Sequence, residues 1–245
     1  MKQKLKDDKV VSVEIREFYE DKPIPRYRSD LVVREAEVRI KVGERIYTHL
    51  FCLPSHFDEL AIGYLNSEGL DPSLISNLEV EEVNPDIKEY EIRVELEKRV
   101  LRHPLKVNSE IKIKKGTVFD LIKKLEEGGI LYNATGSTHV VASSSLNQKG
   151  ETFFIEDVSR HCAIDKLIGM CIKSETKISE SILVTSCRHT RSTMKKVIFA
   201  GFPIVISVSA PTELAIRDAD EFGITLVGFA RDKRFNVYTN DWRIL

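Results

Sequence analysis

The second half of the chain repeats one order, a short apolar run, a polar loop and a helical segment, and this repeat constrains the fold most. From about Ile130 onward the apolar runs are continuous instead of alternating with polar residues. Strands covered by helices on both faces have this pattern. Helices are predicted after Arg160, Arg191 and Pro211, and a proline suits a first helical turn. The predicted strands are Ile130–Tyr132, Thr152–Ile155, Ile182–Val184, Ile204–Val208 and Ile224–Phe229.

Residues 10–129 follow a different pattern, in which apolar and polar residues alternate. Val38, Ile40 and Val42 are one example, and such alternation is typical of half-exposed antiparallel sheet. Two helices interrupt the strands, and capping boxes are predicted at Ser55 with Asp58 and at Thr117 with Asp120. No linker separates the halves. We therefore predict a single α/β domain over residues 1–245, with possible lobes at 10–129 (β-rich) and 130–245.

Composition argues against several classes of protein. The 37 basic residues nearly balance the 38 acidic ones, so net charge does not suggest nucleic-acid or membrane-surface binding. No apolar run approaches the roughly 18 residues of a membrane span, and the charged start of the chain lacks the apolar core of a signal peptide. The four cysteines form no Cys-x-x-Cys, the usual unit of a zinc or dithiol motif. We expect a cytoplasmic protein with reduced thiols and no metal site.

Unusual polar segments follow or precede the predicted strands, at residues 133–139, 156–162, 185–191, 209–213 and 229–234. Ligands collect at the carboxyl ends of strands in sheets of this kind. Arginine forks bind phosphate bidentately, and small hydroxyl residues can also bind phosphate. The segments therefore predict a site for a phosphorylated or nucleotide-like ligand, and the alternative is a set of unrelated solvated loops. The cations are Arg160, Arg188, Arg191, Arg231, Lys233 and Arg234; the hydroxyl residues are Thr135, Ser137, Thr138, Thr185, Ser186 and Thr190.

Several single residues have two interpretations each. His139 and His161 could act as general acid or base, or could simply bond a loop. Asp157 could orient His161 or a ligand, or could cap the following helix, as Ser159 could. Lys166 lies within that helix and could reach a phosphate. Cys162 and Cys187 sit beside His161 and Arg188, which would lower their thiol pKa if they were partly exposed; otherwise they are small buried residues.

Six segments together resemble the formate dehydrogenase accessory protein family, the FdhD-type sulfur carriers. They are HFDELAIGYLNSEGL, TGSTH, EDVSRHCAIDKLIG, TSCRHTRSTMKK, APTELAI and GITLVGFARDKRFNVYT. The resemblance implies a cytidine-deaminase-like fold, a mixed sheet with helices on both faces. It also implies that sulfur passes from a cysteine desulfurase to a molybdenum or tungsten bis-guanine-dinucleotide cofactor, which is then inserted into formate dehydrogenase, and that the protein is a homodimer.

The family's cofactor contacts fall on Phe229, Ala230, Arg231, Asp232, Lys233 and Arg234. The other residues predicted to bind the cofactor are Thr135, Gly136, His139, Asp157, Arg160, His161, Lys166 and Arg188.

The chain departs from the family at the sulfur-carrying Cys-x-x-Cys, because Arg99–Gly116 contains no cysteine. Two explanations compete. The protein could hold the cofactor as a chaperone without sulfur transfer, or Cys162 or Cys187 could carry the persulfide. A third function of another class is a nucleotide-acting small-molecule enzyme with His161 or His139 as base beside Asp157. Its deaminase version lacks the His-x-Glu and Pro-Cys-x-x-Cys zinc ligands.

Overall fold

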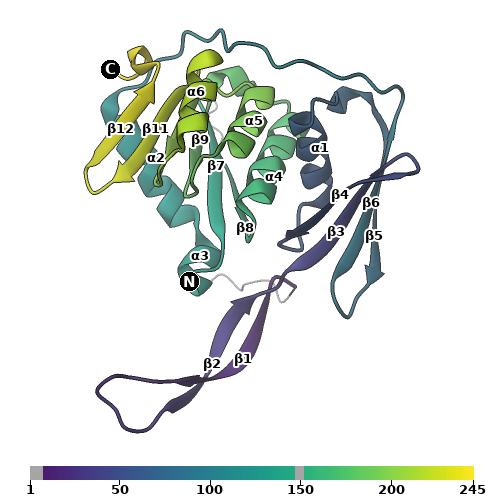
Figure 1. Cartoon of the computed structure of the whole chain (residues 1–245). Coiled ribbons are helices and arrows are strands. Elements are labelled where there is room, and N and C mark those ends of the chain that lie inside the picture. Colours follow the sequence, from purple (N-terminus) through teal and green to yellow (C-terminus); the bar gives the residue numbers. More distant parts are fainter. Residues whose placement is uncertain (1–7, 147–151) are drawn as a thin grey trace.

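A computed structural model describes residues 8–146 and 152–245, and its centre is a six-stranded mixed sheet (Figure 1). The strand order is β12-β11-β10-β9-β7-β8. Strands β9, β10 and β11 are parallel, whereas β7 runs antiparallel between β9 and β8. The carboxyl ends of β8 to β11 and the start of β7 therefore share one edge. The strands are β7 (His139–Ser145), β8 (Thr152–Asp157), β9 (Ser181–Thr185), β10 (Ile204–Ser207), β11 (Thr225–Arg231) and β12 (Arg234–Thr239).

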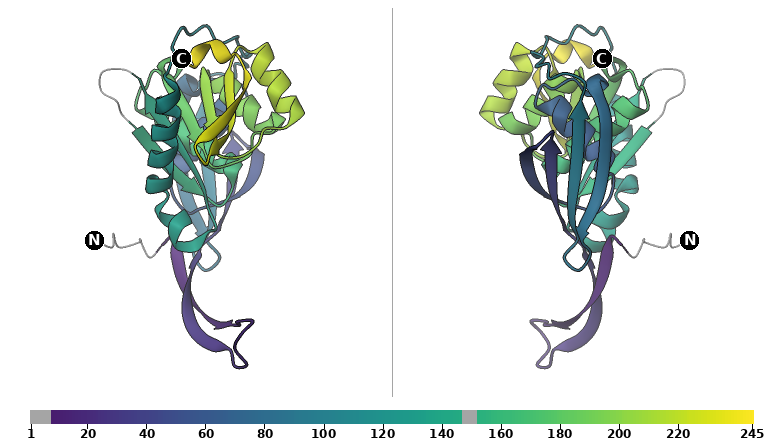
Figure 2. Two further views of the ribbon diagram at one scale, coloured as in Figure 1. Left: turned by 90° about the vertical axis from the view of Figure 1, so that its left-hand side faces the viewer. Right: turned by 90° about the vertical axis from the view of Figure 1, so that its right-hand side faces the viewer.

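Helices cover both faces of this sheet, as predicted (Figure 2). α2 (Lys115–Gly128) lies on one face, and α4 (Arg160–Lys173), α5 (Arg191–Ala200) and α6 (Glu213–Glu221) lie on the other. Successive residues of β7 point to opposite faces of the sheet and pack in two hydrophobic cores. Val140 and Ala142 pack with α2, whereas Val141 packs with α4. The mixed α/β class is confirmed.

The N-terminal part is β-rich, also as predicted, and forms a four-stranded sheet of order β4-β3-β6-β5. The strands are β3 (Ala36–Val42), β4 (Arg45–Cys52), β5 (Ile75–Asn84) and β6 (Glu89–Leu96). α1 (Phe57–Ser67) packs between this sheet and α4. Its contact with α4 is close because two glycines meet the partner backbone. A Cβ on Gly63 would lie 1.8 Å from the Asp165 carbonyl oxygen, and one on Gly169 would lie 1.9 Å from that of Glu59.

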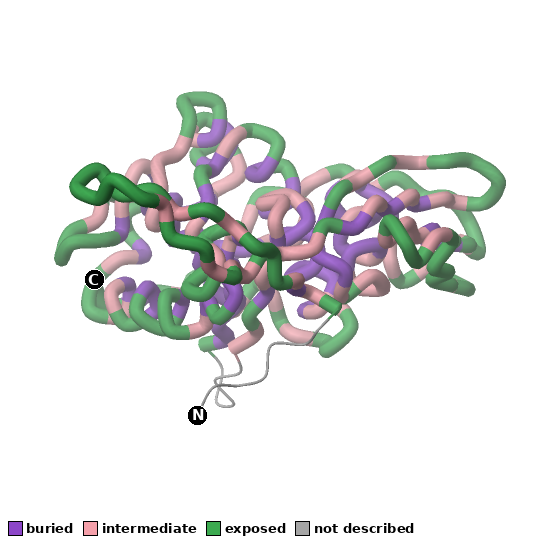
Figure 3. The backbone as a smooth tube through the Cα atoms, turned by 90° about the horizontal axis from the view of Figure 1, so that it is seen from below, coloured by how far each residue is buried: buried purple, intermediate pink, exposed green. Residues whose placement is uncertain are grey.

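A two-stranded hairpin, β1 (Val10–Glu17) with β2 (Arg26–Val33), projects from the molecule and is called the arm below (Figure 1). Only its base is packed: Val10, Leu31 and Val33 contact Leu53 and Leu131. Figure 3 views the molecule from this side, where the arm and the nearby loops are mainly exposed or intermediate. The homodimer implied by the family resemblance stays a prediction.

Residues 98–115, called the strap, run from just after β6 to the first residue of α2. They cross the edge of the six-stranded sheet opposite the carboxyl ends of β8 to β11 (Figure 1). Backbone bonds anchor the strap, from the Arg102 amide to the Gly69 carbonyl (2.7 Å) and from the Val107 amide to the Phe222 carbonyl (2.9 Å). The buried Arg243 guanidinium also donates to the Ser109 carbonyl, at 3.1 and 3.2 Å. Single turns complete the structure at η1 (Pro72–Leu74), η2 (Ile178–Glu180) and η3 (Asp241–Arg243). No helix in the described parts of the chain is long and apolar enough to cross a membrane.

Four predictions of local structure were wrong. Ile130–Tyr132 is not a strand but the start of α3 (Ile130–Thr135). α1 follows His56, a left-handed residue without a side-chain cap, and α2 begins before Thr117, so neither predicted capping box forms. Pro211 precedes the N-cap Thr212 and so lies outside α6. Ser159, in contrast, does cap α4, because its hydroxyl accepts from the Cys162 amide.

Candidate functional site

The five predicted polar segments meet at one edge of the six-stranded sheet, the lower edge in Figure 1. Strand register places them there. His139 pairs with Asp157, and Thr185 pairs with both Val141 and Ser207. The loops after β8, β9 and β10, the hairpin between β11 and β12, and the loop before β7 therefore form one continuous border, which we call the loop edge.

Serine side chains link these loops to one another. The Val140 amide donates to the Ser186 hydroxyl (3.0 Å), and the Ser209 hydroxyl donates to the Ser186 carbonyl (2.8 Å). The Phe229 amide then donates to the Ser209 carbonyl (3.2 Å). Thr185 is similarly occupied, since its hydroxyl donates to the Cys187 carbonyl. The Thr185 and Ser186 hydroxyls, which the sequence suggested as phosphate ligands, thus hold the loops in place. Ser209 belongs to a predicted polar segment but was not among the predicted hydroxyl ligands.

Glu156 fixes the loop before β7. Its carboxylate accepts from the Leu131 amide (2.9 Å), the Tyr132 amide (2.7 Å) and the Thr138 hydroxyl (3.1 Å). These bonds satisfy free amides in the first turn of α3, so a contact distant in sequence produces a helix where local pattern indicated a strand. Gly136 ends α3 with φ +69°, which a glycine adopts without strain.

Asp157 and Lys166 do not reach the surface. Both side chains are fully buried, and the Asp157 Oδ2 lies 2.5 Å from the Lys166 Nζ. Lys166 also donates to the Leu53 carbonyl (2.7 Å), while Asp157 accepts from the Leu53 and Ser159 amides. Burial opposes the charged amine, but the adjacent carboxylate raises the pKa of Lys166 above its ordinary value. Their predicted ligand contacts are replaced by a structural ion pair, and Asp157 has no hydrogen bond to His161 on which an acid–base pair could rest.

The two histidines of the loop edge lie in a positive field. Burial lowers the pKa of His161 to about 4, and Lys196, Arg160 and His139 add to the effect. Burial also lowers the pKa of His139, with smaller effects from Arg160 and Arg188. Both imidazoles are therefore neutral near pH 7, while the arginines carry permanent charge. Such an arrangement favours an anion. Lys196, missed in the sequence, is itself buried and paired with Asp165 at 2.6 Å.

The backbone of the hairpin at residues 229–234 has positive φ at three residues. These are Phe229, Asp232 and Lys233, at 51°, 51° and 62°. Asp232 and Lys233 form the two-residue turn between the paired Arg231 and Arg234, and positive φ at both positions is usual in such a hairpin. Phe229 lies in an irregular stretch of the pairing between β11 and β12. The guanidinium groups of Arg231 and Arg234 each lie 5.8 Å from the centre of the Phe229 ring. Ala230, in contrast, is fully buried in the core with α2, so it offers no side-chain contact to a ligand.

The remaining predicted ligand groups differ in accessibility. Arg188, Arg231, Asp232, Lys233 and Arg234 are exposed, and Thr135 and Arg160 are intermediate. The Arg160 Nε is buried and has no hydrogen-bond partner within the described residues. Arg191 lies 3.3 Å from Asp218, so an ion pair engages its charge.

All four cysteines are free and buried. Burial raises the pKa of Cys187 to about 11. The pKa of Cys162 is also raised, by a hydrogen bond with Cys52 and by burial, and its thiol donates to the Phe51 carbonyl at 3.6 Å. The lowered thiol pKa that the sequence suggested for partly exposed cysteines does not arise, because neither side chain is exposed. The described residues contain no cluster of histidine, cysteine and carboxylate groups suited to a metal.

The chain resembles known proteins in sequence and in fold. Proteins named sulfur carrier protein FdhD are 32% identical in Methanothermobacter thermautotrophicus (87% of this chain, 91% of that protein) and 33% identical in Bacillus subtilis (97% and 99%). A solved structure from Desulfotalea psychrophila, described as a candidate formate dehydrogenase accessory protein, matches 97% of this chain and 100% of its own, with a TM-score of 0.79 and 23% identity. A sequence model of the FdhD/NarQ family matches residues 87–245, and the chain belongs to that family.

Proposed function

We propose that this chain is a formate dehydrogenase accessory protein that binds the molybdenum or tungsten bis-guanine-dinucleotide cofactor at the loop edge. The main support is the positive field there, which arises from permanent arginine charge beside two neutral histidines. Pyrophosphate groups suit such a border, because arginine binds phosphate oxygens in pairs. The β11–β12 hairpin adds exposed cations and the partly exposed Phe229, on whose ring a guanine could stack. The cofactor is cargo in this proposal, to be delivered to the dehydrogenase.

Binding of labelled GDP, followed by fluorescence anisotropy, tests the cofactor site. Arg188→Ala removes an exposed cation, and we expect at least tenfold weaker binding because a hydrogen bond to a charged group contributes about 1.5–3 kcal/mol. Arg217→Ala is the matched control, since Arg217 is an exposed arginine on α6 that pairs with Glu213. Equal affinity of the Arg188 variant and the wild type would contradict a site at the loop edge.

The burial of Cys162 and Cys187 favours a cofactor chaperone without sulfur transfer over a persulfide carried on either of these cysteines. A thiolate is the reactive form of cysteine, and the raised pKa values of Cys162 and Cys187 keep these thiols protonated. We therefore propose that the chain holds the cofactor without carrying sulfur on these cysteines.

Peptide mass spectrometry after incubation with a cysteine desulfurase and cysteine provides the test. We expect no gain of sulfur, in a sample shown separately to bind GDP. A reducible added sulfur atom on Cys162 or Cys187, absent from the corresponding serine variant, would instead support the sulfur-carrier role that the family resemblance implies.

A further inference from the structure

The strap is a local concentration of positive charge in a nearly neutral chain. Residues 98–115 contain seven lysines and arginines and a single acidic residue, although the whole chain has a net charge of −1. The strap therefore has a formal charge of +6, and the rest of the chain has −7. It crosses the edge opposite the loop edge, so the proposed cofactor site makes no use of this charge (Figure 1).

These cations lack acidic partners. No strap lysine or arginine forms an ion pair with any carboxylate in the described chain, whereas cations of the four-stranded sheet pair with neighbouring glutamates, as Lys41 does with Glu91. Arg102 donates to two neutral oxygens, the side-chain Oδ1 of Asn66 (2.6 Å) and the Leu70 carbonyl (3.2 Å). The others are exposed, including Lys106 and Lys114. Two of them also lie over aromatic rings, Arg99 at 5.6 Å from the centre of Tyr47 and Lys112 at 5.8 Å from that of Trp242. Their charge is thus available to a partner.

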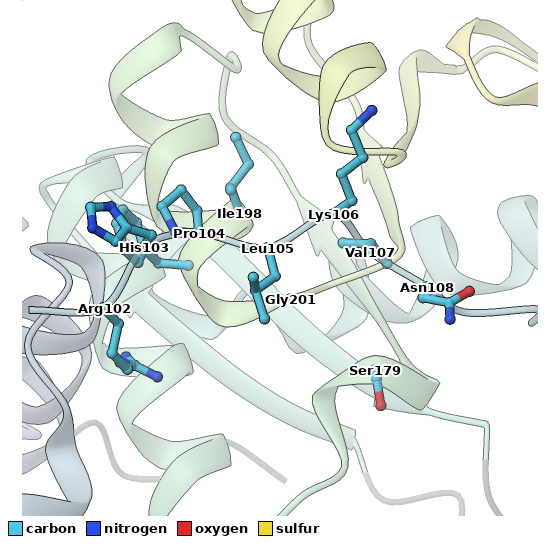
Figure 4. A pocket seen from close by; sticks show the side chains of 11 residues that line it. Arg102, His103, Pro104, Leu105, Lys106, Val107, Asn108, Ser179, Ile198 and Gly201 are labelled. Carbon is cyan, nitrogen blue, oxygen red and sulfur yellow. The ribbon is translucent and has the colours of Figure 1, made fainter.

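The strap also borders a cavity and leaves backbone groups free. A cavity of about 590 Å³ lies between the strap and the end of α5, with Leu105, Val107, Ile198 and Phe199 among its apolar lining (Figure 4). A second cavity, of about 440 Å³, shares Pro104, Ile198 and Phe199 and continues along α5. Between the anchors at Arg102 and Val107, residues 103–106 form no backbone hydrogen bond within the described chain. Leu105 is 80% exposed.

We propose that the strap is a docking surface for an acidic, extended polypeptide segment of a partner protein. Within the described chain, residues 103–106 have free carbonyls and, at every position except Pro104, a free amide, so a partner backbone can bond to the strap over this short stretch. The adjoining apolar cavity can receive one of the partner's side chains. Unpaired lysines select carboxylates and accelerate encounter. A long nucleic acid is disfavoured, because it would extend beyond the strap over a chain whose remaining residues have a formal charge of −7, whereas a short acidic segment can stay on the strap.

A fluorescent eight-residue peptide with six acidic residues, one leucine and one phenylalanine is the probe, and anisotropy measures its binding to the full chain. We expect the wild type to bind it, and the double variant Lys106→Glu/Lys112→Glu to bind at least tenfold more weakly, a change of about 1.4 kcal/mol. Leu105→Ser should also weaken binding, whereas a peptide with amides in place of the carboxylates should not bind. Both substituted lysines are exposed, and within the described residues only Lys112 has a side-chain contact to lose, with the Trp242 ring, so we expect the fold to tolerate the change.

Lys123→Glu/Lys124→Glu on α2 is the matched control, with the same change of charge at exposed positions outside the strap. It should bind the peptide as the wild type does. The proposal is overturned if the wild type does not bind the acidic peptide, or if the strap and control variants lose affinity equally. Tighter binding of a single-stranded oligonucleotide or of polyphosphate than of the peptide, if the strap double variant abolished it and Arg188→Ala did not, would also overturn the proposal and assign the strap to another polyanion.

Discussion

At the scale of single residues, the buried Asp157–Lys166 pair connects the loop edge to the N-terminal part. Lys166→Met would leave the Asp157 carboxylate buried without its cation, and we expect a loss of about 3–5 kcal/mol in the free energy of unfolding. Denaturant unfolding followed by circular dichroism measures it. Asp157→Asn/Lys166→Met removes both charges and should recover part of the loss. If the double variant were no more stable than Lys166→Met, the loss would not come from an uncompensated charge.

His161 predicts a dependence of stability on pH. Its pKa of about 4 in the folded state lies below the ordinary value of 6.5. The unfolded chain therefore binds more protons between these values, and stability falls as pH falls from about 6.5 to 4. In His161→Gln, the free energy of unfolding should fall less over this pH range. We expect the difference from the wild type to be on the order of 1 kcal/mol, because solvent screens a partly buried site. Unfolding at several pH values measures it, with the exposed His103→Gln as control. An unchanged slope in His161→Gln would show that other groups set it.

Sequence pattern located the loop edge but not the role of each residue within it. Loops at strand ends must converge when strands are parallel, so their meeting could be predicted from the order of elements alone. The burial of individual side chains could not be predicted in this way. Asp157, Lys166 and Ala230 lie in polar or signature segments, yet the packing of α4 on Leu53 and of β11 on α2 removes their side chains from solvent.

At the scale of elements, the contact between α1 and α4 depends on Gly63 and Gly169. Because an added methyl group would overlap the facing backbone, we expect Gly63→Ala or Gly169→Ala to destabilise the protein by about 3 kcal/mol or more. Gly116→Ala in α2 is the control, since its Cβ would meet nothing within 4 Å. That change should be neutral or stabilising, by up to about 1 kcal/mol. Thermal unfolding of the three variants measures the difference, and equal melting temperatures would show that the helices can move apart at little cost.

Elements were predictable where their residues formed a clear apolar pattern. They were missed where the apolar pattern was weak or where contacts distant in sequence determined the structure. β9, β10 and β11 are continuous apolar runs and were predicted. Three of the seven residues of β7 are serine, and this strand was missed, as was β5, an acidic edge strand. α3 was predicted as a strand because its helical form depends on Glu156, some 25 residues later in the chain.

At the scale of the whole molecule, the proposed cofactor site and the strap lie at opposite edges of one sheet. β9 has five residues, so it separates the edges by about 16 Å at about 3.3 Å per residue. This distance exceeds the Debye length of about 8 Å at physiological ionic strength, and exposed charges at the two edges should not influence each other there. One molecule could then hold its cargo and a partner together.

This separation predicts additive behaviour. Arg188→Ala should weaken only GDP binding, Lys106→Glu/Lys112→Glu should weaken only peptide binding, and the combined variant should show both losses to within about 0.5 kcal/mol. Anisotropy with each probe, in the presence and absence of the other, measures the coupling. At about 0.01 M salt the Debye length grows to about 30 Å, and a weak mutual effect should appear because both ligands are anionic. Coupling that persisted at physiological salt would have to travel through the sheet itself, as a change in the packing of β9 and β10 between the two edges.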